Sequence, residues 1–474
     1  MNLLAILCSM PFLIVGKAQA APAHNDAPVT GGNQEQGWVI SGLTPGEVYD
    51  IDFSYTTPTL GDKVPYLSAA GRKATLTDGA TTAMTGTLRG VHANPTGKIP
   101  VMLNNALSGV TVSDLTATKA NAVTDLVMGG DLSLLTHLEN NKAAFYDESG
   151  KSVDCLDFVA DNGMNLARLR LYNDPGNPDY SPSKRLPAGI QSPEDILTLA
   201  RRAKDKGMQI LVTFYYSDYW ADGAHQTKPH AWADLSYADL KKAVYDFTKD
   251  YMQKLIAQGT TPEFVSIGNE IQAGILFPDG ACGNPRQMAE LLNAGAKAVR
   301  ELTPDARIVI HSAAGEGMAE STLKWFFGLL RDYNVDYDII GISYYPFWSN
   351  SSASQFRAVA NRLINGFDKD ILIMETGYSW NATLPSGYPG QLSHNGPYAE
   401  FSKLGQRDFM LDLSNQIKQV NSGRVLGYIY WDPIFIETPG LGWVVGGQNV
   451  ISNTTLFGFQ GESLPVLDAY KYNN

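Results

Sequence analysis

The chain has 474 residues, of which 44% are hydrophobic and 18% charged, and this composition is typical of a folded globular protein. Its length corresponds to about two or three domains. The formal net charge is -12 and no basic run or basic face occurs, which argues against a nucleic-acid partner and favours a neutral or weakly charged substrate.

Residues 1–20 are predicted to be a signal peptide, because Leu3–Val15 is mostly apolar and Ala18–Ala20 is a small-x-small cleavage site. The apolar stretch is too short for a membrane span, and no later run of ~18 apolar residues follows. We therefore expect a secreted protein without a membrane span, either extracellular or at the periplasm or cell surface. Residues 21–36 are polar and Gly/Asn/Pro-rich, which predicts a flexible lead-in.

Residues 37–120 predict an all-β, sandwich-like domain. Short segments rich in β-branched and aromatic residues are separated by turn clusters such as Thr44-Pro45-Gly46, and no helix-length periodic run occurs. The segments are WVISGL, VYDIDFSY, KATLT and VTVSDLTAT.

Residues 123–474 predict a (β/α)8 TIM barrel, so the fold class is α/β with a small all-β domain in front. Helical stretches at 193–207, 237–259 and 285–302 alternate with apolar runs, and eight such β–α units in one region predict a barrel. The eight runs are 124–133, 165–174, 209–218, 263–271, 307–315, 338–348, 370–378 and 425–433.

Polar and aromatic residues gather at the C-terminal ends of these runs. Barrel enzymes place their chemistry on that face, so this pattern predicts an active site there. The residues are Asp131, Arg170, Asp218, Asn269, Glu270, His311, Tyr344, Tyr345, Glu375 and Trp431.

Glu270 in VSIGNEI and Glu375 in LIMETGY each end an apolar segment that is otherwise uncharged. Glycoside hydrolysis needs two carboxyl groups, one to protonate the leaving oxygen and one to attack or to activate water. An isolated buried carboxylate is costly, so such a residue has either a task or a partner. The alternative is a structural ion pair with Arg168 or Arg170.

An Asn-Glu pair after strand 4 and a Glu after strand 7 resemble the retaining barrel glycosidases of clan GH-A. The resemblance implies that Glu270 is the acid/base, Glu375 the nucleophile, and Asn269 the partner of the sugar 2-hydroxyl. Glu270 then needs a raised pKa, and the carboxyl groups should lie ~5–5.5 Å apart, as in retaining enzymes.

Over residues from about 124 to the C-terminus the chain resembles the arabinogalactan endo-β-1,4-galactanases, glycoside hydrolase family 53. The resemblance implies endo-hydrolysis of β-1,4-galactosidic bonds in the (arabino)galactan side chains of pectin, with retention. The matching stretches are GGDLSLL (129–135), GMNLARLRLYNDP (163–175), YSDYWAD (216–222), SIGNEIQAGILFPDG (266–280), LLNAGAKAVR (291–300), GISYYPFW (341–348), METGYSW (374–380), GYIYWDP (427–433) and LFGFQGESLPVL (456–467).

The chain departs from this pattern at three positions. Tyr215 stands where a histidine is usual, Thr213 where an acid is common, and Asp432 where a glutamate is usual. Both catalytic carboxylates are intact, so these changes bear on the subsites and the substrate range.

Further candidates for the substrate site come from strand ends and loops. Arg168 and Arg170 share a strand face, and we expect one to orient a catalytic glutamate or to pair with Asp131. Trp431 is a candidate stacking floor for a sugar or a core residue. Either Tyr344 or Tyr345 is expected to hydrogen-bond the nucleophile.

The loops after strands 3 and 6 carry four more candidates, and we expect them to line a groove. His311 is interpreted either as a substrate contact or as a hydrogen-bonded strand-end histidine. The four loop residues are Trp220, Asp222, Trp232 and Trp348.

No cofactor is expected. Calcium, which bacterial members of the family often bind after strand 7, is not favoured, because the loop 380–402 offers few acids. Its candidate ligands are Asn381, His394, Asn395 and Glu400. Cys155 and Cys282 are either two unpaired thiols, the favoured interpretation, or a disulfide.

Two other functions remain as alternatives: a glucanase or mannanase of the same clan, and a surface glycan-binding protein without catalysis. The β domain loosely resembles sandwich modules attached to polysaccharide-degrading enzymes, and is interpreted as a carbohydrate-binding module or a spacer. It contains only one tryptophan, Trp38. We expect a monomer that binds polysaccharide.

Overall fold

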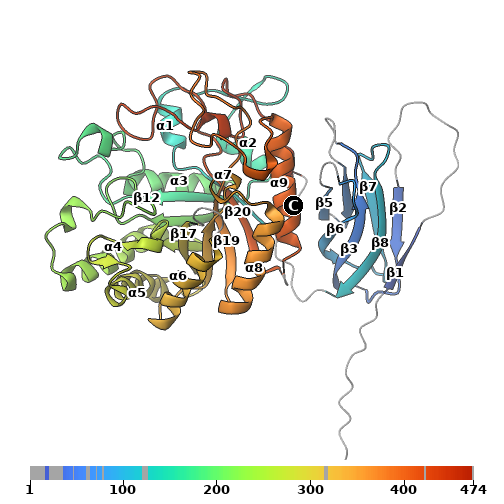
Figure 1. Cartoon of the computed structure of the whole chain (residues 1–474), viewed down its shortest axis with the longest axis horizontal. Helices are drawn as coiled ribbons and strands as arrows, with labels where there is room; N and C mark the ends of the chain where they lie inside the picture. The colour runs from blue at the N-terminus through green and yellow to red at the C-terminus, as the bar shows by residue number, and fades with distance from the viewer. Residues whose placement is uncertain are drawn as a thin grey trace, which may run out of the picture. The chain divides into compact units, whose positions relative to one another are not determined.

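The computed structural model describes residues 16–20, 36–45, 47–59, 65–70, 72–76, 80–119, 126–313, 319–420 and 423–471 (Figure 1). The chain forms two compact units, one with the residues up to Asp125 and one spanning Leu126–Lys471. Each unit has its own core, as expected for an all-β domain followed by a barrel.

The first unit is a β-sandwich with antiparallel pairing throughout and the strand order β5-β4-β7-β2-β1-β8-β3-β6. Alternation along the strands produces the core: in β7, Ile99, Val101 and Leu103 point inward and the residues between them outward. The strands are β1 (Gly16–Ala20), β2 (Gln36–Ile40), β3 (Val48–Thr56), β4 (Tyr66–Ala69), β5 (Arg72–Thr75), β6 (Met84–His92), β7 (Ile99–Asn104) and β8 (Thr111–Lys119).

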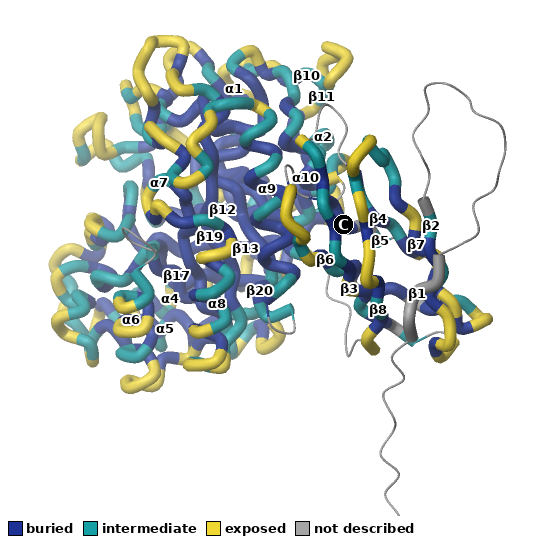
Figure 2. The backbone as a smooth tube through the Cα atoms, turned by 45° about the vertical axis from the view of Figure 1, so that its right-hand side comes forward, coloured by how far each residue is buried: buried dark blue, intermediate teal, exposed yellow. Residues whose placement is uncertain are grey.

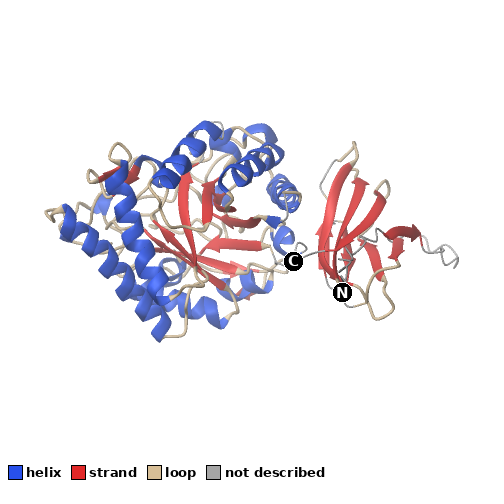
Figure 3. Cartoon of the chain, turned by 90° about the horizontal axis from the view of Figure 1, so that it is seen from below, coloured by secondary structure: helices blue, strands red, loops and turns tan. Residues whose placement is uncertain are grey.

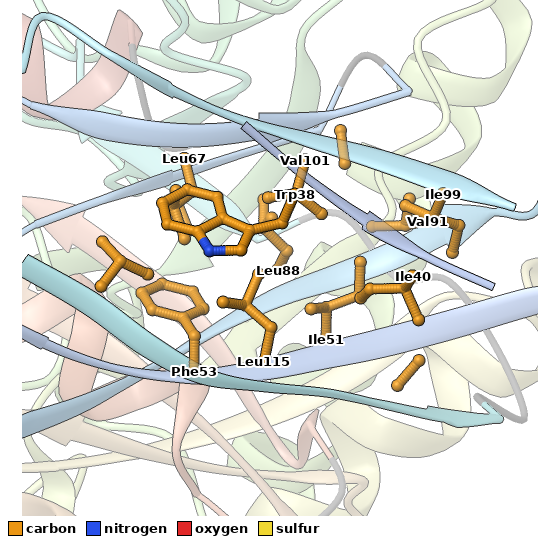
Figure 4. Close-up of a cluster of buried hydrophobic side chains, with 14 of the residues drawn as sticks. Trp38, Ile40, Ile51, Phe53, Leu67, Leu88, Val91, Ile99, Val101 and Leu115 are labelled. Carbon is orange, nitrogen blue, oxygen red and sulfur yellow. The ribbon is translucent and has the colours of Figure 1, made fainter. Parts of the chain in front are cut away.

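The two halves of this sheet face each other across an apolar core (Figure 4). Trp38 and Leu67 come from one half, Phe53 and Leu88 from the other. Trp38 is only 7% exposed, so the one tryptophan before residue 126 is not available to stack on a sugar. Both interpretations of this domain, a spacer and a carbohydrate-binding module, stay predictions.

Residues 1–15 of the predicted signal peptide lie outside the described residues. So do residues 21–35 of the predicted lead-in, 21–36. Residues 16–20 are described as β1, which pairs with β2 through Ala18–Ala20 and with β8 through Gly16 and Lys17. The signal peptide and the lead-in stay predictions, and the predicted cleavage after Ala20 would remove β1 and leave β2–β8 in the mature domain.

The second unit is a closed barrel of eight parallel strands, which confirms the predicted fold class. The order is β12-β13-β14-β17-β18-β19-β20-β9, and every one of the eight predicted runs contains one strand. The strands are β9 (Val127–Asp131), β12 (Leu166–Leu171), β13 (Gln209–Phe214), β14 (Phe264–Ile267), β17 (Arg307–Ala313), β18 (Ile339–Ser343), β19 (Asp370–Thr376) and β20 (Val425–Tyr430).

Helices surround the barrel strands, which are buried on both faces (Figures 2 and 3). The helices are α1 (Leu135–Asn140), α2 (Cys155–Asp161), α3 (Pro193–Asp205), α4 (Tyr237–Ala257), α5 (Pro285–Leu302), α6 (Glu320–Asp332), α7 (Pro346–Ser349), α8 (Ala353–Phe367), α9 (Lys403–Lys418) and α10 (Leu467–Lys471). The loops contain short 3-10 turns and two small antiparallel hairpins. The hairpin strands are β10 (Phe145–Tyr146) with β11 (Ser152–Val153) and β15 (Gly274–Ile275) with β16 (Gly280–Ala281).

Local signals set the helix ends. Ser192 caps α3 by accepting a hydrogen bond from the backbone N–H of Asp195, and Pro193 opens its first turn. The predicted helix ended at Gly207, but α3 ends at Asp205 because Gly207 has φ +75°, a left-handed conformation that stops the helix.

Ion pairs gather at the N-terminal end of the barrel strands, opposite the predicted site. These side chains are partly exposed, and they join strand starts to one another and to α5. The pairs are Arg300–Asp336 (2.9 Å), Arg300–Asp338 (2.9 Å), Arg307–Asp370 (2.7 Å) and Arg424–Asp370 (2.7 Å).

Among the described residues, no helix is both long and apolar enough to cross a membrane. Cys155 is buried, Cys282 is partly exposed, and both are free thiols. In the structure the two cysteines are therefore not joined by a disulfide, in agreement with the favoured interpretation.

Candidate active site

A cavity of about 550 Å³ opens at the C-terminal ends of the barrel strands. Both predicted catalytic glutamates, Glu270 and Glu375, line it. The other lining residues are Tyr215, Trp220, Ala221, Asp222, Gly223, Asn269, Ala313, Ser343, Tyr345, Trp348, Ser349, Gln391, Leu392, Trp431 and Trp443.

Glu375, near the end of β19, is held by two donors. Arg168 Nη1 lies 2.7 Å from its Oε1, and the Tyr345 hydroxyl donates to its Oε2 at 3.0 Å. The choice between two tyrosines is therefore settled for Tyr345, because the Tyr344 hydroxyl donates to the backbone carbonyl of Ser351 instead. With one oxygen on each donor, the carboxylate has a fixed orientation in the cavity.

Arg168 is fully buried, and its guanidinium contacts polar side chains from several barrel strands. It donates to Glu375 and, through Nη2, to Asn269 Oδ1 at 2.7 Å, and it lies 3.6 Å from Asp131. Orienting the glutamate and pairing with Asp131, proposed as alternatives, are thus combined in one side chain.

Glu270 follows β14 at a sharp turn. Its own φ is +50°, in the left-handed region, directly after Gly268 and Asn269. A non-glycine residue in this region carries strain, which is typical of residues that the fold holds in place for a task. The turn directs Glu270 into the cavity, where its Oε1 lies 2.6 Å from Ser343 Oγ.

The two glutamates are close and electrostatically coupled. An oxygen of Glu270 and an oxygen of Glu375 lie within 4.8 Å of each other. This upper limit is below the ~6.5–9.5 Å carboxyl separation of inverting glycosidases and agrees with the shorter ~5–5.5 Å of retaining ones. Burial raises the pKa of Glu270 to about 8, and the charge of Glu375 adds to the rise.

Asn269 and His311 form a row behind the glutamates. Asn269 Oδ1 lies 2.9 Å from His311 Nδ1, and its Nδ2 donates to the carbonyl of Ala221 at 2.9 Å. His311 Nε2 lies 2.8 Å from Ser343 Oγ. His311 is thus a hydrogen-bonded strand-end histidine, as one interpretation had it, and it does not line the cavity.

Aromatic side chains form one wall of the cavity. The Trp431 and Trp443 ring centroids are 5.2 Å apart, Trp220 packs on Trp443 at 5.3 Å, and the Arg170 guanidinium lies 4.9 Å over the Trp220 ring. Trp348, at the cavity edge, is 46% exposed. Broad apolar faces of this kind suit the C–H faces of sugar rings.

Arg170, Asp131 and Asp432 form a buried charge cluster behind this wall. Arg170 Nε lies 3.3 Å from Asp131 Oδ2, and Arg170 Nη2 lies 3.7 Å from Asp432 Oδ1. Burial raises the pKa of Asp432 to about 7. Asp131 and Arg170 do not line the cavity; they lie behind its wall and beside Arg168.

Three further predicted contacts lie elsewhere. Asp218 accepts hydrogen bonds from the backbone N–H groups of Asp174 and His230, and so fixes the loop after β13. Trp232 is 8% exposed and packs against aromatic rings of the core. With Tyr344, these residues stabilise the scaffold instead of lining the cavity.

Several lining residues were not predicted, among them Ser343, Gln391 and Trp443. Trp443 carried a signal: a tryptophan in a glycine-rich loop after the last strand is hard to explain as core. Ser343 and Gln391 are small or common polar residues without such a signal. Tyr215, one of the departures from the family pattern, does line the cavity.

The residues do not fit a calcium ion in the loop 380–402. The Asn395 side chain is used within the loop, accepting from the Ser379 N–H and donating to the Ser379 carbonyl. His394 Nδ1 accepts from the Gly396 N–H. Glu400 is the one carboxylate in the loop, whereas calcium prefers six to eight oxygens with several carboxylates.

Glu270, His311 and Glu375 bring three ligand-type atoms within 4.8 Å. Each of these side chains already has protein partners: Ser343 for Glu270, Asn269 and Ser343 for His311, and Arg168 and Tyr345 for Glu375. A guanidinium directed at one of the carboxylates opposes a second cation there, so the cluster is better suited to acid–base chemistry than to a metal.

Comparisons with known proteins give consistent matches. The family model described as "Glycosyl hydrolase family 53" matches residues 127–470. The chain is 33% identical over 326 residues to the arabinogalactan endo-β-1,4-galactanase of Cellvibrio japonicus (strain Ueda107), covering 66% of this chain and 82% of that protein. It is 29% identical to the endo-β-1,4-galactanase of Bacillus subtilis (strain 168), covering 73% of this chain and 86% of that protein.

Two solved structures have the same fold. The family 53 catalytic domain of Ignisphaera aggregans is 35% identical, with a TM-score of 0.69, covering 74% of this chain and 97% of that domain. A fungal β-1,4-galactanase is 29% identical, with a TM-score of 0.62, covering 72% of this chain and 98% of that structure.

Proposed function

The chain belongs to glycosyl hydrolase family 53, and we propose that it hydrolyses internal β-1,4-galactosidic bonds in the (arabino)galactan side chains of pectin, with retention of configuration. One observation carries the mechanism: two carboxyl groups within 4.8 Å face one cavity. One of them is ion-paired with Arg168, and the pKa of the other is raised. The relatives named above act on galactan or arabinogalactan, which supports the substrate class.

In the first step, Glu375 attacks the anomeric carbon while Glu270 gives its proton to the leaving oxygen. Arg168 and Tyr345 hold the two oxygens of Glu375, so the attacking carboxylate is oriented before substrate arrives. Because the pKa of Glu270 is raised to about 8, this group carries the required proton at neutral pH.

In the second step, water attacks the glycosyl-enzyme and Glu270 takes the water's proton. Once Glu375 is esterified it has no charge, so its contribution to the raised pKa of Glu270 is removed. The acid of the first step thereby becomes a better base for the second.

Asn269 can bind the sugar 2-hydroxyl in only one way. Its Oδ1 is occupied by Arg168 and His311, and one hydrogen of Nδ2 is donated to Ala221. The second Nδ2 hydrogen is the group that can donate to a hydroxyl at the cavity wall. Trp431 supplies the stacking floor beneath the reacting sugar.

The test of this function is product release from linear β-1,4-galactan, compared with β-1,4-glucan and β-1,4-mannan, with the anomeric configuration followed by NMR. We expect short oligosaccharides from galactan that are first β-configured. Glu270→Ala should lower the rate about 10²–10⁴-fold. Cleavage of glucan or mannan alone would favour another clan GH-A glycosidase, and binding without cleavage would favour a glycan-binding protein.

A pH dependence follows from the raised pKa of Glu270. Because the acid form is required, kcat/KM on galactan should be retained up to about pH 8 and fall about tenfold per pH unit above it. A substrate with an aryl leaving group that needs no protonation should show a weaker alkaline decline in its bond-cleavage step. An alkaline decline centred near pH 5 would contradict this assignment.

No metal or organic cofactor is proposed. Dialysis against EDTA is expected to change kcat on galactan by less than about twofold, because the loop 380–402 lacks a calcium ligand set. Thermal unfolding in EDTA and in excess calcium should give the same midpoint. A calcium-dependent rise in the midpoint would contradict the proposal.

We also propose that the protein is exported and acts as a monomer. The apolar stretch Leu3–Val15 and the cleavage site Ala18–Ala20 support export. Pectin side chains are outside the cell that digests them, so the proposed substrate requires the same location. The polysaccharide is the partner that the cavity is proposed to bind.

A further inference from the structure

A continuous row of hydrogen bonds connects the two catalytic carboxyl groups through the barrel interior. From Glu270 it passes to Ser343 (2.6 Å), His311 (2.8 Å), Asn269 (2.9 Å) and Arg168 (2.7 Å). Arg168 then donates to Glu375 at 2.7 Å. Apart from Glu270, all members are buried, so each donor in this row has few alternative acceptors.

Arg168 fixes the direction of the hydrogen bond at His311. A guanidinium only donates, so the Asn269 atom that it contacts must be the oxygen. The other amide atom donates to the Ala221 carbonyl, which agrees with this orientation. His311 Nδ1 faces that same oxygen at 2.9 Å and must therefore carry a hydrogen.

The remaining nitrogen of His311 then needs a donor. His311 is buried beside the cationic Arg168, and both effects lower its pKa and keep the ring neutral. Because the one ring hydrogen is on Nδ1, Nε2 has only a lone pair, and Ser343 Oγ at 2.8 Å is its donor.

Ser343 has one hydroxyl hydrogen, for which two acceptors compete: Glu270 Oε1 and His311 Nε2. If Glu270 is protonated, it can donate to Ser343 Oγ while Ser343 donates to His311, and every atom is satisfied. If Glu270 is ionised, its carboxylate also needs the Ser343 hydrogen, and either Glu270 or His311 is left without a donor.

We propose that His311 is a positioning residue that keeps the proton on Glu270, by competing with the Glu270 carboxylate for the single hydroxyl hydrogen of Ser343. His311 does not touch the substrate cavity, and it acts only through Ser343. This role rests on the proposed function, in which Glu270 is the acid. The other groups that act on Glu270 are Glu375, Asp222 and Arg168.

The hydrogen positions balance over the catalytic cycle. When Glu270 gives its proton to the leaving oxygen, the Ser343 hydroxyl turns from His311 to the new carboxylate. When Glu270 takes a proton from the attacking water, the Ser343 hydroxyl turns back. His311 stays neutral throughout and exchanges no proton.

The experiment is a double-mutant cycle on the full chain, with His311→Leu, Ser343→Ala and the pair combined. The readout is the pKa of Glu270, taken from its carboxyl band in infrared difference spectra, with Glu270→Gln identifying the band. The alkaline limb of kcat/KM on β-1,4-galactan gives the same quantity. The control is Ser312→Ala, since the Ser312 hydroxyl donates to the Ala313 carbonyl and not to Glu270.

His311→Leu should lower the pKa of Glu270 by about 0.5–1 pH unit, because one neutral hydrogen bond no longer favours the acid form. In the Ser343→Ala background the same change should have no effect, since the connection is already cut. An unchanged or raised pKa in His311→Leu, or an equal shift in both backgrounds, would overturn the proposal.

A second measurement needs no variant. It follows the ¹⁵N chemical shifts of His311 in wild-type protein with ¹⁵N-labelled histidine as Glu270 ionises. The Nε2 shift should move toward the value of a nitrogen that accepts no hydrogen bond, while Nδ1 keeps its hydrogen. A signal that does not follow Glu270 would also overturn the proposal. Both spectroscopic tests work without substrate, so they are independent of whether wild type cleaves galactan, which tests the proposed function alone.

Discussion

Glu375→Ala is expected to lower kcat on β-1,4-galactan by about 10³-fold or more. The alanine removes the carboxylate that Arg168 and Tyr345 hold in the cavity, and no other described carboxylate has this position. Azide should restore turnover of an aryl β-galactoside by occupying the vacated space, and the product should be the α-galactosyl azide. This inverted product would identify Glu375 as the nucleophile.

The same assay separates Glu375 from Glu270. Azide rescue of Glu270→Ala should give the β-galactosyl azide, because the glycosyl-enzyme still forms and azide replaces the water. Glu301→Gln, on the outer surface of α5, is the matched control and should change kcat by less than about twofold. If Glu375→Ala kept more than a tenth of wild-type activity, the assignment of the nucleophile would be wrong.

Arg168→Met should lower both stability and activity. The side chain is fully buried and contacts Glu375, Asp131 and Asn269, so methionine leaves two enclosed carboxylates without their shared cation. Breaking a buried pair in this way costs about 3–5 kcal/mol in the free energy of unfolding. We also expect kcat to fall about 10²-fold or more, because Glu375 and Asn269 lose their orientation.

Two variants test the cause of this loss. Arg168→Lys keeps the charge but cannot reach two acceptors with a planar fork, so stability should return more fully than activity. Arg300→Met removes partly exposed ion pairs at the other end of the barrel, and should cost no more than about 1 kcal/mol without lowering kcat. Denaturant unfolding and galactan hydrolysis measure both quantities, and equal stability of Arg168→Met and wild type would refute the argument.

The fold was predictable because the barrel strands are buried on both faces and appear in the sequence as uninterrupted apolar runs. All eight runs contain a strand, and α3, α4 and α5 begin at the predicted residues. The two catalytic glutamates were predictable for the same reason: a charge at the end of such a run needs an explanation.

Side-chain direction after a strand was harder to predict. Tyr344 and Tyr345 are adjacent, so one side chain points toward Glu375 and the other points outward. The sequence alone does not determine which of the two faces Glu375. Trp232 and Asp218 lie in long loops, whose tertiary contacts decide whether a side chain faces the cavity or the scaffold. Ser343 was missed because a serine has no distinct pattern.

The ion pairs at the strand starts have a practical consequence for engineering. Arg300, Arg307 and Arg424 bind their aspartates at the end of the barrel opposite the cavity, and these pairs are partly open to water. Salt screens such pairs, whereas the enclosed Arg168–Glu375 contact is shielded from it. Heat tolerance and salt tolerance can therefore be adjusted by redesigning that end, while bond cleavage at the other end stays as it is.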